Sequence, residues 1–367
     1  MKISVILPYK ENFSPEYAGS VSLFLKDTIK LSKYKKSITV FGSTSYRKKL
    51  LKNYQNILFS NFFFRSSTKI YLKKFLEFEK NQKSDLIEIH NRPQYINYIH
   101  KLNKKIVLYF HNDPLSMKYS KKLIDRINII NRTQKIIFNS KWTQNQFTKD
   151  IPKKIYRNKL LIINQSTKKQ KVNFYDKEKI IIFVGRLNKS KGFDIFFKAV
   201  TNVLDKFPEW KSIIIGDEPR EKYTINHKRF KLLGFLKHSS VIKWFKKSSI
   251  AVVCSRINEP FGRTALEASS CGCAVIISNN GGLPEASPHA IKLKNLSVKN
   301  LEKNLIHLIR NKKKLLKLQR TIFDTFNLTN LKMSKKIDSY RNDLKKKNSY
   351  SLILFSALFL NNFAFFI

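Results

Sequence analysis

The sequence predicts an α/β protein built from two doubly wound parallel sheets that face a central cleft. Short apolar strands alternate with helical segments, and the same plan occurs twice along the chain. A length of 367 residues is too great for one ordinary hydrophobic core and favours two domains. Ligands of open α/β sheets bind at the carboxyl ends of the strands, so two facing sheets predict one shared cleft.

The elements follow from apolar runs and helical periodicity. Near-continuous apolar runs typical of buried parallel strands occur at residues 3–7, 37–41, 86–89, 105–110 and 135–138 in the first half. In the second half they occur at 180–184, 212–215, 251–254 and 274–277. Helical patterns lie at 21–32, 193–206, 241–247, 263–270 and 300–310. The polar, lysine-rich and unpatterned stretch 168–179 is expected to link the two halves.

The charge balance limits the classes of partner. With 72 Lys and Arg against 25 Asp and Glu, the formal net charge is +47. A nucleic-acid-binding protein would explain this charge, because Lys and Arg displace counterions from phosphates. However, lysine is spread over the whole chain, and no zinc-ligand spacing, RNA-binding signature or homeodomain-like helix occurs. We therefore expect no nucleic-acid partner, and favour an anionic membrane surface or an acidic acceptor.

The cysteines and the two ends of the chain bear on its location. Cys254, Cys271 and Cys273 lack the ligand count of a zinc site and are expected to be buried, reduced thiols. The first apolar run is too short for a signal peptide, so a reducing cytoplasm is expected. Residues 349–367 form an apolar tail behind the basic run 345–347. Two alternatives stay open for this tail: an interfacial membrane anchor, or an extension beyond the folded body.

The most informative motif is residues 259–267, Glu-Pro-Phe-Gly-Arg-Thr-Ala-Leu-Glu. Pro260 and Gly262 prevent one continuous helix through both glutamates. The unit is therefore strand, loop, helix, with Glu259 in the loop, Gly262 near the helix start and Glu267 one or two turns later. Free backbone N–H groups and the helix dipole favour an anion between the two carboxylates. This arrangement would suit a nucleotide sugar; the alternative is two solvated glutamates around a turn.

Other candidate residues also follow predicted strands. Arg186 and Lys191 lie on the loop after 180–184, where two cations can hold a diphosphate, although a solvated basic loop is the alternative. Gly19 precedes the first helix and allows close approach of a ligand, or simply a tight turn. His111 ends the strand 105–110 and is favoured as functional, whereas His90 after 86–89 is favoured as structural. The loop Gly281-Gly282-Leu283-Pro284-Glu285 is expected to enter a helix at the cleft rim.

Together these motifs resemble those of retaining glycosyltransferases of GT-B family 4, also called glycosyl transferases group 1. The resemblance covers about residues 1–345 and is strongest over 180–290, where Gly-Arg-Leu…Lys-Gly, Glu-Pro-Phe-Gly…Leu-Glu-Ala and Gly-Gly-Leu-Pro-Glu stand in family order. In the first half Ala18-Gly19 stands where the family usually has Gly-Gly. The family includes many bacterial enzymes of envelope-glycan and lipopolysaccharide synthesis.

The resemblance implies two facing Rossmann-like domains. They are an acceptor-side domain at 1–168 and a nucleotide-sugar-binding domain at 169–325, followed by a helix at 326–348 that returns to the first domain. It also implies roles for individual residues in binding the donor. Arg186 and Lys191 would bind the donor diphosphate, Glu259 the sugar, backbone amides near Phe261 and Gly262 the sugar and phosphate, Glu267 the ribose, His111 the sugar near the reacting carbon, and Gly19 the donor phosphates.

The implied activity is transfer of a hexose-type sugar from a nucleotide-diphosphate sugar to a hydroxyl of a glycan or lipid-linked acceptor. No metal or other cofactor is expected, and the sequence contains no Asp-x-Asp pair. The expected location is the cytoplasm, with peripheral contact at the inner face of the membrane. Two alternatives stay open: a nucleotide-sugar epimerase or hydrolase of the same fold, and a non-enzymatic basic protein that binds membrane or nucleic acid.

Overall fold

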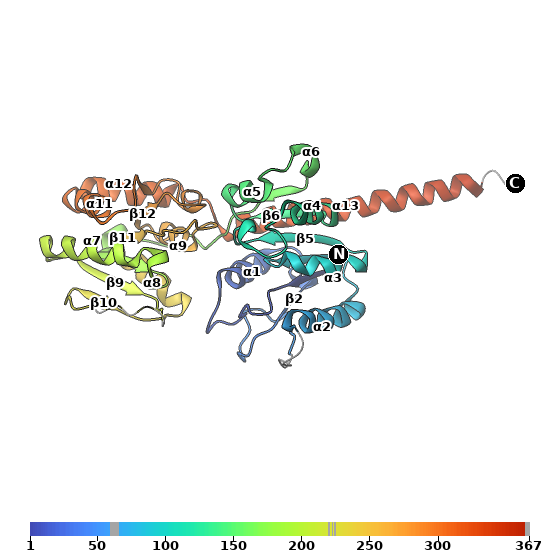
Figure 1. The fold of residues 1–367 in the computed structure, drawn as a ribbon, viewed down its shortest axis with the longest axis horizontal. Helices are drawn as coiled ribbons and strands as arrows, with labels where there is room; N and C mark the ends of the chain where they lie inside the picture. Colours follow the sequence, from blue (N-terminus) through green and yellow to red (C-terminus); the bar gives the residue numbers. More distant parts are fainter. Residues whose placement is uncertain (59–65, 219–220, 222, 224, 364–367) are drawn as a thin grey trace.

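The computed structural model describes residues 1–58, 66–218, 221, 223 and 225–363, with side chains described as far as residue 346, and it contains two parallel-sheet domains (Figure 1). The N-terminal sheet has the strand order β3-β2-β1-β4-β5-β6-β7, and the C-terminal sheet has the order β10-β9-β8-β11-β12-β13. The pairs within both sheets are parallel. The predicted fold class is therefore confirmed.

The N-terminal domain alternates strands and helices. Its strands are β1 (Ile3–Ile6), β2 (Ile38–Gly42), β3 (Tyr54–Asn56), β4 (Leu86–His90), β5 (Lys105–Phe110), β6 (Lys135–Phe138) and β7 (Leu160–Ile162). Its α-helices are α1 (Ser20–Leu31), α2 (Ser67–Gln82), α3 (Ile96–Ile99), α4 (Leu123–Arg132), α5 (Lys141–Thr148) and α6 (Lys153–Tyr156). Apolar side chains of the sheet pack against α2, α3, α4 and α5 on one face and against α1 on the other.

The C-terminal domain repeats this plan. Its strands are β8 (Glu178–Val184), β9 (Lys211–Ile215), β10 (Phe230–Leu232), β11 (Ser248–Val253), β12 (Ala274–Ser278) and β13 (Ile291–Leu293). Its helices are α7 (Phe193–Lys206), α8 (His238–Lys247), α9 (Arg263–Ser270), α10 (Leu283–Ala286), α11 (Val298–Arg310) and α12 (Lys312–Asp324). Helices α7 and α11 cover one face, and α8, α9 and α12 cover the other. Because both faces are buried, the central strands are apolar at nearly every position.

The last helix, α13 (Asn330–Phe363), returns to the N-terminal domain and packs against α1 (Figure 1). Arg341 of this helix forms a buried bidentate pair with Glu88 of β4, at 2.8 Å and 2.7 Å. Asp338 accepts hydrogen bonds from the Ser32 hydroxyl and the Lys33 N–H at the end of α1. These contacts attach the C-terminal segment to the first domain.

Two segments of the chain cross between the domains side by side. Thr167, after β7, forms a parallel bridge with Thr329, just before α13. Gln165, Ser166 and Thr167 are buried, although their polarity is typical of an exposed linker. The predicted linker, 168–179, begins directly after this bridge, and its last two residues belong to β8.

The predicted tail, 349–367, lies partly outside the described residues. The backbone is helical as far as Phe363, and residues 364–367 fall beyond the described range. Within the described residues, no helix is both long enough and apolar enough to cross a bilayer.

The three cysteines of the C-terminal domain, Cys254, Cys271 and Cys273, are buried free thiols, and burial raises the pKa of Cys254 to about 12.

Candidate functional site

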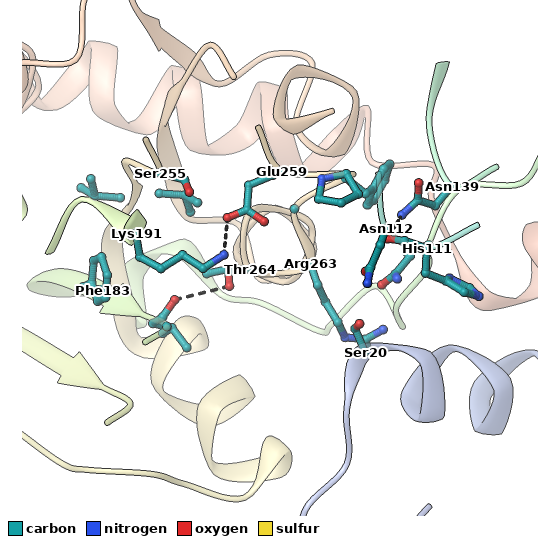
Figure 2. A pocket seen from close by; sticks show the side chains of 18 residues that line it. Ser20, His111, Asn112, Asn139, Phe183, Lys191, Ser255, Glu259, Arg263 and Thr264 are labelled. Carbon is teal, nitrogen blue, oxygen red and sulfur yellow. Dashed lines mark hydrogen bonds and ion pairs between the residues drawn. The ribbon is translucent and has the colours of Figure 1, made fainter. Parts of the chain in front are cut away.

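A cavity of about 240 Å³ lies between the two domains, at the carboxyl ends of both sheets. Five of the predicted site residues line it: His111, Lys191, Glu259, Phe261 and Gly262. Figure 2 shows the first three of them. The cavity therefore brings together predicted residues that lie as many as 151 positions apart, from His111 to Gly262. Arg186, Glu267 and Gly19 stand outside the set of described residues that line it.

Glu259 and Lys191 come from two neighbouring βα loops of the C-terminal sheet. Lys191 follows β8, Glu259 follows β11, and the ammonium of Lys191 forms an ion pair with Oε1 of Glu259 (Figure 2). The side chains are only 22% and 15% exposed, so the pair lies inside the cavity wall. The loops themselves are joined by a hydrogen bond from the Arg256 N–H to the Ser190 carbonyl, at 2.9 Å. The pair presents one cation and one anion to a ligand at fixed positions.

Gly262 forms the N-cap of α9 with φ of 111°, in the left-handed region that favours glycine. A Cβ at this position would also lie 2.4 Å from Cδ2 of Leu283. Phe261 beside it is buried in the C-terminal core. The glycine thus lets the backbone turn into α9 at the cavity, which exposes the positive end of the helix to a ligand.

Glu267 lies behind this wall, one turn further along α9. Its Oε1 accepts hydrogen bonds from Nε2 of His238, at 2.8 Å, and from Nε of Arg263, at 2.7 Å. Burial alone would raise the pKa of Glu267, but the positive charge of Arg263 and the His238 hydrogen bond outweigh it and lower the pKa. Glu267 is therefore an ionised, buried carboxylate, and His238 and Arg263 are its hydrogen-bond donors.

Gly19 and Arg186 occupy different surroundings from the other predicted residues. Arg186 is exposed on the loop after β8. Gly19 is the N-cap of α1 with φ of −75°, and a Cβ there would lie 2.5 Å from Oε1 of Glu11. The same carboxylate oxygen accepts hydrogen bonds from the Ser22 N–H, at 3.1 Å, and the Ser22 hydroxyl, at 2.7 Å. Gly19 thus makes room for Glu11, which caps α1.

His111 at the end of β5 is paired with a second histidine. Its Nε2 lies 2.9 Å from Nδ1 of His90, so one of the two nitrogens donates a hydrogen to the other. Burial lowers the pKa of His111 to about 3, and burial together with the neighbouring His111 lowers the pKa of His90. The Asn139 side-chain amide donates to the His111 carbonyl at 2.9 Å. The imidazole is therefore neutral near pH 7 and held in one orientation.

Among the other residues that line the cavity, three with polar or charged side chains were given no role by the sequence: Arg263, Gln165 and Asn139. Arg263 is the first residue of α9, and a position directly after a left-handed glycine is a signal that could have pointed to it. Gln165 lies in the buried interdomain crossing, and Asn139 follows β6. The carboxyl end of β6 is one more strand end at the same sheet edge, so topology could have indicated Asn139.

The domains contact each other directly beside Glu259. The carbonyl of Pro260 accepts hydrogen bonds from the hydroxyls of Ser140, at 2.6 Å, and Thr143, at 3.1 Å. The Glu285 carboxylate accepts from the backbone N–H groups of Lys141, at 2.7 Å, and Trp142, at 2.9 Å. The N-terminus of α5 in one domain is thus capped by a carboxylate of the other, as expected for an anion at a helix start.

Known proteins resemble this chain both in sequence and in fold. The family model described as glycosyl transferases group 1 matches residues 164–322. The crystal structure of Alr3699/HepE from Anabaena in complex with UDP superposes with a TM-score of 0.73, covering 94% of this chain and 100% of that chain at 18% identity. The fold is GT-B. In GT-B terms the cavity lies in the cleft between the two Rossmann-like domains.

Curated relatives match over shorter spans. An uncharacterized glycosyltransferase of Methanocaldococcus jannaschii, MJ1607, is 33% identical over 136 residues, which are 33% of this chain and 34% of the relative. The gpi3 subunit of the phosphatidylinositol N-acetylglucosaminyltransferase of Schizosaccharomyces pombe is 32% identical over 116 residues, 29% of this chain and 25% of the relative. The chain thus covers about a third or less of the length of these two relatives. Together the family model and the relatives support a glycosyltransferase on this GT-B fold.

Proposed function

We propose that this chain is a retaining glycosyltransferase of family 4. It moves a hexose-type sugar from a nucleotide-diphosphate sugar to a hydroxyl of a glycan or lipid-linked acceptor. The observation that carries the proposal is the placement of Lys191, Glu259 and the N-terminus of α9 around one interdomain cavity. A cation and a helix N-terminus suit a diphosphate, and a carboxylate beside them suits sugar hydroxyls.

The ion pair between Lys191 and Glu259 suggests how the site changes its contacts when a donor binds. Without a donor, the Lys191 ammonium is neutralised by Glu259. A donor diphosphate competes for that ammonium and leaves the Glu259 carboxylate to accept hydrogen bonds from the sugar. Both charged groups are then in place before the chemical step. They can stabilise the transition state with no further rearrangement of the site.

In the proposed reaction the bond between the anomeric carbon and the diphosphate oxygen breaks, and its electron pair stays on that oxygen. Lys191 and the α9 backbone N–H groups stabilise the departing diphosphate, with Arg186 contributing from the loop. The acceptor hydroxyl attacks the oxocarbenium-like carbon from the same face, and its proton passes to the departing phosphate oxygen. The anomeric configuration is therefore retained. The neutral imidazole of His111 contributes a dipole near the sugar and no charge.

The proposed setting is cell-envelope polysaccharide or lipopolysaccharide synthesis at the inner face of the cytoplasmic membrane. The net charge of +47 and the basic run before residues 349–367 support contact with anionic lipids. Co-sedimentation with phosphatidylglycerol vesicles tests this part. Retention of the full chain, reduced by 0.5 M salt and absent with phosphatidylcholine, is expected; equal binding to both lipids contradicts it.

The activity is tested in two steps. A thermal-shift panel of UDP, GDP, ADP and CMP should show stabilisation by at least one nucleotide, because a ligand that binds only the folded state raises the unfolding temperature. The corresponding nucleotide sugar is then incubated with and without membrane extracts as acceptor, and products are analysed by mass spectrometry and NMR. Acceptor-dependent formation of an α-linked product from an α-linked donor supports the proposal. Conversion of the donor at the same rate without acceptor indicates an epimerase or hydrolase instead.

A further inference from the structure

We infer that Arg263 is a direct ligand-binding residue whose guanidinium binds the diphosphate of the donor, and that Glu267 positions it. This inference rests on the proposed function and assigns a further residue to the same site. Figure 2 shows the Arg263 side chain extending from the start of α9 towards Ser20 at the start of α1, across the domain interface. Both residues line the cavity.

The hydrogen bonding of Arg263 is incomplete in the described structure. Its Nε donates to Glu267 at 2.7 Å. Its two terminal nitrogens, Nη1 and Nη2, have almost no solvent-exposed surface and no hydrogen-bond partner among the described residues. Buried N–H groups are nearly always paired, because removing them from water without a partner is unfavourable. A charged guanidinium with both ends unpaired therefore indicates an absent partner that is anionic.

Two other residues of the same cavity carry unpaired buried atoms. They are Oε1 of Gln165 and Nδ1 of His111, and these residues are only 4% and 6% exposed. The cavity thus combines unpaired donors on Arg263 with an unpaired amide acceptor on Gln165. A ligand with both anionic oxygens and hydroxyl groups satisfies this set, and a nucleotide sugar has both.

The charges of the cavity point to Arg263 as a binding group for the anion in addition to Lys191. Lys191 is neutralised by Glu259 in the unliganded site, and Arg186 is exposed outside the lining. Of the cations on the described lining, Arg263 is thus the one with terminal nitrogens that have no hydrogen-bond partner. A planar guanidinium offers two parallel N–H donors to two oxygens of a phosphate, which an ammonium does not.

The competing explanation is that Arg263 only neutralises the buried Glu267. That explanation accounts for Nε and leaves Nη1 and Nη2 without partners. Glu267 also has a second partner in His238. The Glu267 bond instead holds the guanidinium through Nε and leaves its two terminal nitrogens unbonded, as expected for a positioned binding group.

The test compares affinity for a nucleoside diphosphate with affinity for the nucleoside alone, by isothermal titration calorimetry on the full chain. The nucleotide is whichever of UDP, GDP and ADP binds the wild-type protein most tightly. We expect Arg263→Gln to weaken diphosphate binding by tenfold or more and nucleoside binding by less than threefold. Arg263→Lys should give an intermediate loss, since it keeps the charge and loses the planar geometry.

Two controls separate binding from structural effects. His238→Gln removes the other partner of Glu267, so it should leave the ratio of diphosphate to nucleoside affinity unchanged. Arg320→Gln removes one exposed positive charge on α12, away from the cavity, and should leave both affinities unchanged. Unfolding temperatures without ligand show whether each variant is folded at the temperature of the titration.

The outcomes distinguish this inference from the proposed function. A wild-type protein that binds no nucleoside diphosphate overturns the proposed function and the inference with it. A wild-type protein that binds one, with an unchanged affinity ratio in folded Arg263→Gln or Arg263→Lys, overturns the role of Arg263 alone. An equal loss of diphosphate and nucleoside affinity in both variants identifies Arg263 as structural.

Discussion

The ammonium of Lys191 forms an ion pair with the carboxylate of Glu259, from the loop after β8 to the loop after β11. These strands are neighbours in the C-terminal sheet, so the two loops meet at the same edge. The pair lies in the cavity that both domains share. In the proposed complex Lys191 contacts the donor diphosphate and Glu259 contacts the sugar. Its two members should therefore respond differently to substitution.

Glu259→Gln should lower kcat by about 100-fold, because charge placed for a transition state is typically worth that much. Its affinity for a nucleoside diphosphate should stay equal or rise a few-fold, since Lys191 loses its competing partner. Steady-state kinetics and calorimetry measure the two effects. Glu302→Gln, on α11 beside Lys206 of α7, is the matched control. Wild-type turnover in Glu259→Gln would remove this residue from the mechanism.

Glu285 should hold the domains together. Hydrogen bonds to charged groups contribute about 1.5–3 kcal/mol, and its carboxylate accepts two from the start of α5. Glu285→Ala should raise the donor KM by about tenfold, which corresponds to about 1.4 kcal/mol, and should increase the radius of gyration in X-ray scattering. Glu209→Ala, which removes an exposed partner of Lys179, serves as control. An unchanged radius and KM would show that the contact does not stabilise closure.

The buried pair of Glu88 and Arg341 should stabilise the attachment of α13. Removing one partner of a buried pair typically costs about 3–5 kcal/mol, because the other charge is left uncompensated. Arg341→Met should therefore lower the free energy of unfolding by that amount in urea titrations. The double substitution Glu88→Gln with Arg341→Met should recover part of the loss. A loss below about 1 kcal/mol for Arg341→Met would contradict a buried, closed pair.

The two histidines should make stability fall in acid. Both have lowered pKa values in the folded protein, with His111 at about 3, whereas unfolded histidine titrates near about 6.5. Between these values the unfolded state binds more protons, so the free energy of unfolding falls as pH decreases below about 6.5. His111→Asn should show a shallower fall between pH 7 and pH 5 than wild type. Identical slopes would indicate that the imidazole is solvated or charged in the folded protein.

The fold could be predicted because both faces of each sheet are buried. This produces apolar runs that mark the central strands to within a few residues. The short edge strands β3, β7, β10 and β13 were missed, since each has three residues and at least two of them are partly or fully exposed. Polar residues interrupt β3, β10 and β13, and β7 is apolar (Leu-Leu-Ile) but only three residues long.

The site could be predicted in part, for a related reason. Lys191 and Glu259 each follow a central strand, so topology alone brings them to one edge. Nothing in a local pattern tells which way the long side chain of Arg263 points, or that Glu285 reaches a helix 144 positions away. Gly19 shows the same limit: its neighbour in space is Glu11, which lies within the preceding loop.

The central claim is that the interdomain cavity binds a nucleotide sugar through its diphosphate. Calorimetric titration of the nucleoside diphosphate selected by the thermal-shift panel, against wild type and Lys191→Met, tests it most directly. We predict saturable binding to wild type at a stoichiometry of about one and an affinity at least about tenfold lower in Lys191→Met. Absence of binding to wild type, or equal affinity in the two proteins, would contradict the claim.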